Sequence, residues 1–144
     1  QKGSALLVDF VEQAAHGDHT PMEIMEMYSR FFYRLMKEHP YILRIFSWEM
    51  IHPTDVFASI GKERFAMVLV VLRGALTEGI EEGCFRKDLK PTEVCISWAG
   101  MVAYYYLMNE IKKRFSVKEE ITEDSYMHQA FDVLMNGIKN KEIG

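Results

Sequence analysis

Apolar positions along this chain recur every three to four residues, which is the period of an amphipathic helix. No segment shows the sustained alternation of apolar and polar residues that a half-buried strand requires. Glycines and His-Pro pairs interrupt the helical pattern at intervals. The interruptions leave six expected helices, at about residues 4–16, 20–37, 41–51, 59–82, 91–115 and 122–139. The pattern therefore predicts an all-α fold, a bundle of about six helices.

Local signals fix several of the expected helix ends. Thr20-Pro21-Met22-Glu23 has the sequence of a capping box, with proline at the first helical position. Gly17 and Gly83 follow helical segments and are expected to act as C-terminal caps. The segment 91–115 is apolar on nearly all sides, so it must be covered on more than one face. In a chain this short, a second subunit could supply part of that cover.

Length and composition favour one domain covering residues 1–144. The chain is 49% hydrophobic, which is enough for a buried core, and it contains no Pro-rich or Gly/Ser-rich linker. Its net charge is -4, and its longest basic run is Lys112-Lys113-Arg114. Proteins that bind nucleic acid usually carry a basic stripe for the phosphates. We therefore expect these residues by themselves to bind DNA poorly.

The cysteines and the uncharged segments bear on the cellular compartment. Cys84 and Cys95 have the spacing of neither a zinc site nor a disulfide framework, and two reduced thiols fit a reducing cytoplasm. The longest uncharged run, residues 94–109, is shorter than the roughly 20 residues of a membrane span. We expect a cytoplasmic protein without a membrane contact.

One stretch resembles a known family. Residues 79–91 read Gly-Ile-Glu-Glu-Gly-Cys-Phe-Arg-Lys-Asp-Leu-Lys-Pro. This stretch is similar to a turn in the C-terminal part of TetR-family transcription regulators, where a Gly-x-x-x-Gly helix end precedes an aromatic-Arg-x-Asp turn and a proline-led helix. His39-Pro40-Tyr41-Ile42-Leu43 and the segment 131–138 resemble the family more weakly, as do residues 2–7, which are similar to the end of its head. On physical grounds we expect the turn to have a structural role only. Gly83 can end a helix, Phe85 can fold back as an apolar anchor, and Arg86 can pair with Asp88.

The resemblance implies an effector-binding and dimerising domain whose ligand changes DNA binding. It also implies that DNA is bound only through an N-terminal helix-turn-helix head, which we expect to be missing from this chain. The last two helices would form a four-helix bundle with those of a second subunit. For this homodimer interface we expect apolar residues of the last helix: Met127, Phe131, Leu134, Met135 and Ile138.

A pocket for an apolar or amphipathic small molecule is expected among the four central helices. Their inner stripes carry large aromatic residues and methionines, whose flexible thioethers suit irregular apolar sites. Glu49 lies within the apolar stripe of the short helix 41–51 and could orient a polar group of the ligand. The expected lining comprises Tyr28, Phe31, Phe32, Phe46, Glu49, Met50, Phe65, Leu69, Trp98, Met101 and Tyr105.

Neither an enzyme motif nor a cofactor motif is present. Phosphate loops, nucleophile elbows and CxxC pairs are absent, so we predict no catalytic residue and no cofactor. Glu49-x-x-His52 has the spacing of a di-iron bundle ligand pair, but such bundles need two of these motifs and two further glutamates, so we expect no metal. A helical metal-binding or enzyme bundle remains the alternative, as does an adaptor domain that binds other proteins.

Overall fold

The computed structural model describes residues 2–52, 62–115 and 121–141, and within these ranges it contains helices and no strand. The all-α prediction is therefore confirmed. The helices are α1 (Lys2–His16), α2 (Pro21–Glu38), α3 (Pro40–Ile51), α5 (Lys62–Glu82), α6 (Pro91–Phe115) and α7 (Glu123–Ile138). Their bounds agree with the expected ones to within a few residues. The expected start of the fourth helix at residue 59 lies outside the described residues.

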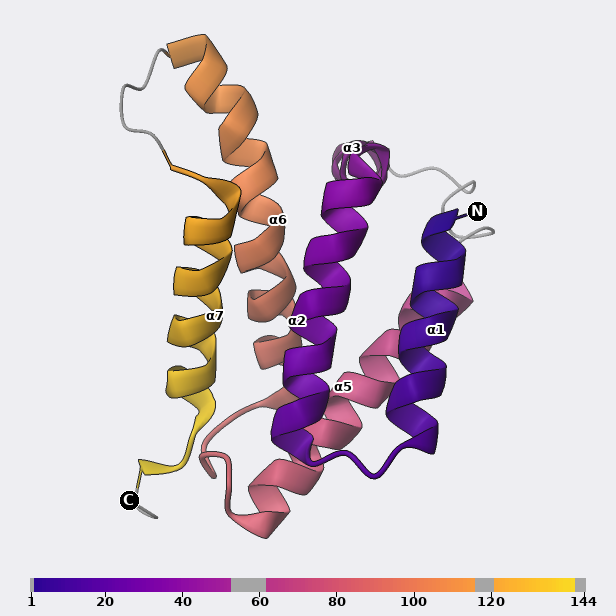
Figure 1. The fold of residues 1–144 in the computed structure, drawn as a ribbon, viewed down its shortest axis with the longest axis vertical. Coiled ribbons are helices and arrows are strands. Elements are labelled where there is room, and N and C mark those ends of the chain that lie inside the picture. The colour runs from indigo at the N-terminus through magenta and orange to yellow at the C-terminus, as the bar shows by residue number, and fades with distance from the viewer. Residues whose placement is uncertain (1, 53–61, 116–120, 142–144) are drawn as a thin grey trace.

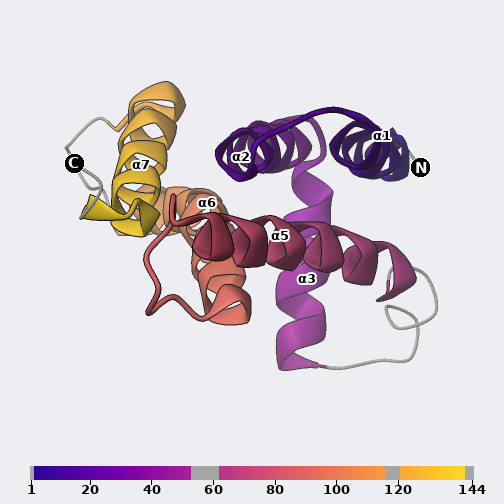
Figure 2. The same cartoon turned by 90° about the horizontal axis from the view of Figure 1, so that it is seen from below.

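The helices form two layers. Helices α1 and α2 lie side by side and run in opposite directions, and both pack on α5 (Figure 1). Seen from below, α1, α2 and α7 lie on one side of α5 and α6, and α3 extends past α5 to the other side (Figure 2). Helix α6 packs against α2, α5 and α7, so it lies between the α1–α2–α5 group and the last helix.

Capping at the starts of α2 and α7 follows the sequence signals. Thr20 Oγ1 accepts a hydrogen bond from the Glu23 amide at 3.1 Å, and Glu23 Oε1 accepts one from the Thr20 amide at 3.2 Å, which completes the predicted capping box. These bonds to Thr20 are the main reason that the pKa of Glu23 lies below its usual value. Thr122 caps α7 by accepting a bond from the Ser125 amide at 3.2 Å.

The two glycines of the Gly-x-x-x-Gly motif have different tasks. Gly83 has a φ of 83°, so it ends α5 in the left-handed conformation as predicted. Gly79 makes room, because a Cβ there would collide with the ring of Phe85, which is fully buried. Gly17 differs from Gly83: among the described glycines only Gly83 has a positive φ, and a Cβ at Gly17 would meet the His19 ring. Helix α1 ends at His16, directly before Gly17 as expected, but Gly17 follows it without the left-handed conformation of Gly83.

The main core lies where α2, α5 and α6 meet. Its largest fully buried side chains are Met25, Leu72, Leu76, Phe85 and Trp98. Phe10 of α1 and Ile138 of α7 belong to the same cluster, so both ends of the chain contribute to it. A smaller cluster forms around Leu35, Met36 and Val102, where the C-terminal part of α2 meets the middle of α6.

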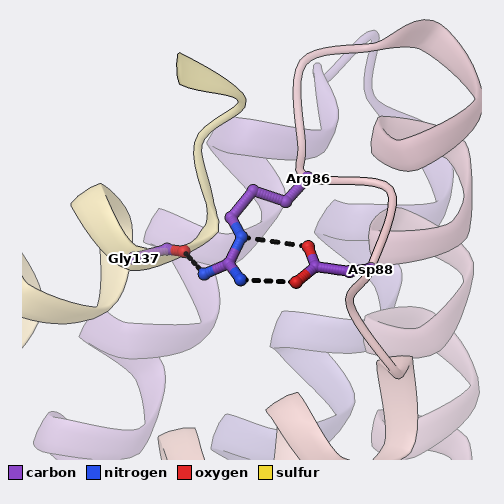
Figure 3. A network of polar contacts seen from close by, with 3 residues as sticks. All are labelled: Arg86, Asp88 and Gly137. Atoms are coloured by element: carbon purple, nitrogen blue, oxygen red, sulfur yellow. Dashed lines mark hydrogen bonds and ion pairs between the residues drawn. The ribbon is translucent and has the colours of Figure 1, made fainter. Parts of the chain in front are cut away.

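The turn between α5 and α6 is attached to the end of α7. The Arg86 amide donates to the Ile138 carbonyl at 2.9 Å, and the Asn140 amide donates to the Cys84 carbonyl at 3.0 Å. The Arg86 guanidinium donates to both oxygens of Asp88, at 2.6 and 3.0 Å, and to the Gly137 carbonyl at 2.9 Å (Figure 3). The turn that resembles the TetR family therefore holds the C-terminal end of α7. We call these bonds of Arg86 and Asn140 the Arg86 clamp.

Candidate functional site

A cavity of about 320 Å³ lies between α2, α6 and α7. Helix α6 packs against both other helices, and its residues Trp98 and Val102 form the inner wall of the cavity, which we call its floor. The lining is mostly apolar, with polar groups on α2 and at the start of α7. The lining residues are Ser29, Arg30, Tyr33, Trp98, Val102, Asp124, Met127, His128, Ala130, Phe131 and Leu134.

Trp98 forms part of the cavity floor, and its polar group is satisfied. The side chain is 0% exposed, and its indole Nε1 donates a hydrogen bond to Ser29 Oγ. The Ser29 hydroxyl in turn donates to the Met25 carbonyl at 3.1 Å, one turn earlier on α2. Ser29 thereby uses its only donor and one acceptor position on the protein. A ligand above Trp98 would meet the ring and apolar walls rather than an unsatisfied donor.

Tyrosines hold the first turn of α7 against α2 and α6. Tyr33 of α2 donates to Asp124 Oδ1 at 2.8 Å, and Tyr106 of α6 donates to Glu123 Oε1 at 2.6 Å. Tyr126 donates to the Met101 carbonyl at 2.6 Å. Desolvation, followed by the bond to Asp124, raises the pKa of Tyr33 to about 12. Desolvation and the Glu123 carboxylate likewise raise the pKa of Tyr106.

Among the described residues of the predicted pocket, only Trp98 lines this cavity. Trp98 lines the cavity, whereas Tyr28 is buried in the main core. Phe31 stacks on Phe10 with 4.9 Å between ring centroids, so it serves the α1–α2 contact. The other described members pack without lining this cavity: Phe32 lies 5.7 Å from the Tyr28 ring, Tyr105 lies 5.1 Å from the Tyr126 ring, Leu69 packs against the main core, and Met101 is half-buried.

Four predicted lining residues cannot be placed. The side chains of Phe46, Glu49, Met50 and Phe65 lie outside the described part of the structure. The expected pocket between α2, α3, α5 and α6 therefore stays a prediction. The cavity next to it was missed because its polar members come from α7 and from the middle of α2. One signal was available: Ser29 follows Met25 by one turn on the buried face of α2, and a polar residue there needs a partner.

The residues expected at a dimer interface lie partly inside this subunit. Met135 and Ile138 are buried in the chain's own core, because the Arg86 clamp holds the end of α7 against it. Met127, Phe131 and Leu134 are half-buried and line the cavity. Among the described side chains, the large apolar residues that α6 and α7 expose are others: Ile96, Tyr104, Leu107 and Val133. The interface stays a prediction, but Met135 and Ile138 are already covered by their own chain.

Within the described ranges, no cluster of three His, Cys, Asp or Glu side chains could hold a metal ion. The ring of His52 lies 4.5 Å from that of Trp48. Both cysteines are free thiols: burial raises the pKa of Cys95 to about 11, and Cys84 Sγ donates to the Gly79 carbonyl at 3.4 Å. None of the described helices is long and apolar enough to cross a membrane.

Comparison with known proteins identifies a family. Neither the curated proteins nor the solved structures contain a significant match. A family model described as "Tetracyclin repressor-like, C-terminal domain" matches residues 21–139. The match begins at the first residue of α2 and ends just after α7, so it includes every element that lines the cavity. The resemblance to the TetR family is therefore confirmed, and the match covers most of the chain. The chain belongs to the family of TetR-like C-terminal domains.

Proposed function

We propose that this domain senses an apolar or amphipathic small molecule in the cavity between α2, α6 and α7, and that it regulates DNA binding by helix-turn-helix heads of the intact regulator. The observation that carries this proposal is the cavity itself, an apolar space of about 320 Å³ over the buried Trp98 ring. Pockets for small ligands are typically concave, mostly apolar and provided with a few polar groups. The family to which the chain belongs supports a regulatory ligand-binding role.

The packing offers a route from the cavity to the start of the chain. Helix α2 lines the cavity and also packs against α1, with the stacked pair Phe10–Phe31 in the contact. A ligand acts only if it binds one arrangement of the domain better than another. A shift of α2 would move α1, which in the intact regulator would lead from the heads. A coupling of about 1–3 kcal/mol is enough for a useful switch, since heads spaced wrongly for their half-sites lose specific binding.

Trp98 provides a direct test of ligand binding. The other tryptophan, Trp48, is 60% exposed, so a Trp48→Phe variant leaves Trp98 as the single fluorescent indole. A library of small apolar and amphipathic compounds would be added to this variant, with melting temperature and Trp98 emission measured in parallel. We expect compounds that raise the melting temperature to change the Trp98 emission as well.

A matched result would locate the ligand. If stabilising compounds leave the Trp98 emission unchanged, the ligand lies elsewhere and the proposed cavity is wrong. Phe65→Ala and Glu49→Gln would then test the other predicted pocket, between α2, α3, α5 and α6. If neither the apolar nor the amphipathic compounds bind to the folded wild-type domain, the sensor function itself is contradicted.

We also infer a homodimer that uses the exposed faces of α6 and α7. Ile96 is 66% exposed, Tyr104 is 54% exposed, and both lie on one side of α6 with Leu107. Val133 of α7 is 51% exposed, and Gly100 and Gly137 have open space where a side chain would stand. Small residues beside exposed apolar ones favour close packing with another surface. Dimerisation is also what the family suggests.

A further inference from the structure

We propose, on the basis of the sensor function above, that the ligand is a short amphipathic carboxylic acid. Its carboxylate would pair with Arg30 at the mouth of the cavity, and its apolar chain would lie over Trp98. Both residues line the same cavity, Arg30 from α2 and Trp98 from α6. The proposal adds a charge and a size to a ligand that was so far described only as apolar or amphipathic.

The geometry of α2 and α7 places two basic side chains at one level of the cavity. The two helices run in opposite directions (Figure 1), and Tyr33 bonds to Asp124 across the gap between them. Arg30 precedes Tyr33 by three residues, and His128 follows Asp124 by four. With a rise of 1.5 Å per residue, each step moves roughly 5 Å down the same side of the cavity. Arg30 and His128 therefore form the next layer below the Tyr33–Asp124 bond.

The available charges in these two layers favour an anion. Asp124 already accepts a hydrogen bond from Tyr33, and it lies in the first turn of α7, where the helix dipole stabilises a negative charge. Arg30, in contrast, forms no ion pair with any carboxylate in the described part of the chain. Its neighbour Arg34, one turn further on, pairs with Glu38 at 3.1 Å. A free guanidinium beside an apolar space is suited to bind a carboxylate with two parallel hydrogen bonds.

An acid of medium chain length fits the volume of the cavity. A space of about 320 Å³ holds roughly ten water-sized groups, since each water occupies about 30 Å³ in the liquid. Octanoate, with about ten non-hydrogen atoms, is of this size. The walls that its chain would meet are Val102, Phe131 and Leu134, which are apolar and come from α6 and α7.

The experiment compares three probes of equal chain length in the Trp48→Phe protein. Octanoate, 1-octanol and octylammonium would be titrated at neutral pH, with Trp98 emission as the readout. We expect octanoate to bind at least about tenfold more tightly than the other two, which is the usual effect of one charge-assisted contact. Arg30→Gln is expected to remove this preference while leaving the binding of 1-octanol unchanged.

Arg34→Gln is the matched control. Arg30 also faces a groove between α1 and α2, and Arg34 lines that groove but not the cavity. We expect Arg34→Gln to bind octanoate like the parent protein. An equal loss in the two variants would place the acid in the α1–α2 groove and overturn the proposal. A preference for octylammonium or 1-octanol would overturn the anionic ligand but leave the sensor function intact, whereas no response to any probe would count against both.

Discussion

The ring of Phe85 occupies the space beside Gly79 where a side chain would otherwise begin. The ring is fully buried, and the Cys84 and Phe85 amides both donate to the Gly79 carbonyl at 3.0 Å. Gly83 is needed for its left-handed backbone conformation, whereas Gly79 is needed because it has no side chain. It lets the turn fold back onto α5. The spacing of the two glycines in the family motif reflects these two separate needs.

Replacing Gly79 with alanine should destabilise the domain. The new methyl group would collide with Phe85, and such overpacking usually costs about 1–3 kcal/mol, more than the gain of up to about 1 kcal/mol in helix propensity. Gly74→Ala is the control, because Gly74 lies in the same helix with open space around it. It should stabilise the domain by about 0.5–1 kcal/mol. Chemical denaturation measures both, and equal effects would contradict the role assigned to Phe85.

Ser29→Ala should destabilise the domain by about 1–3 kcal/mol, because it leaves the buried Trp98 indole without an acceptor. Trp98→Phe removes the donor and part of the core as well. In the double variant, the loss should be smaller than the sum of the two single losses, since no orphaned indole remains. Strictly additive losses would show that the bond contributes nothing to stability. Denaturant titration of the four proteins provides this comparison.

Alkaline pH should weaken the contact between α2 and α7. The pKa of Tyr33 is about 12 in the folded chain, against 10.0 for an ordinary tyrosine. The folded state therefore keeps this proton longer, and the stability linked to it is complete below pH 10 and is lost as the pH rises towards 12. Tyr33→Phe should show a shallower decline of unfolding free energy in that window. Parallel declines in the two proteins would contradict the shift.

A charge on the exposed face of α6 should dissociate the proposed dimer. Tyr104→Glu would place a carboxylate within an interface that we expect to bury about 2,000 Å² or more. Val8→Glu on α1 is the control, because Val8 is exposed and apolar but lies on another helix. Sedimentation at micromolar concentration should show monomer for Tyr104→Glu and dimer for Val8→Glu. A monomeric parent protein at that concentration would contradict the dimer altogether.

The helices were predictable because their signals are local. Thr20 and Glu23 need only each other to form the capping box, and Gly83 needs only its own backbone. The cavity was not predictable in the same way. It depends on the distance between α2 and α7, which no local pattern encodes. Aromatic stripes marked Tyr28 and Phe31 as lining residues, and neither lines this cavity, since a stripe that faces a core has the same spacing as one that faces a pocket.

The dimer face shows the same limit for the last helix. Met135 and Ile138 are apolar and correctly spaced for an interface, but the turn at Arg86 covers them from within the chain. The contacting residues Arg86 and Gly137 lie about fifty positions apart along the sequence. Only the folded chain shows which apolar face of α7 is already buried and which stays exposed.

The clamp at Arg86 also makes the two ends of α7 mechanically unequal. At its C-terminal end, backbone hydrogen bonds of Arg86 and Asn140 join the helix to the α5–α6 turn. At its N-terminal end, tyrosine hydroxyls make hydrogen bonds that join it to α2 and α6, such as the bond from Tyr33 to Asp124. Side chains can exchange partners with water by rotating, whereas the backbone bonds break only if the turn itself unfolds. We therefore expect α7 to separate from its neighbours first at its N-terminal end near Tyr33, which lies beside the cavity, while the end near Arg86 stays attached.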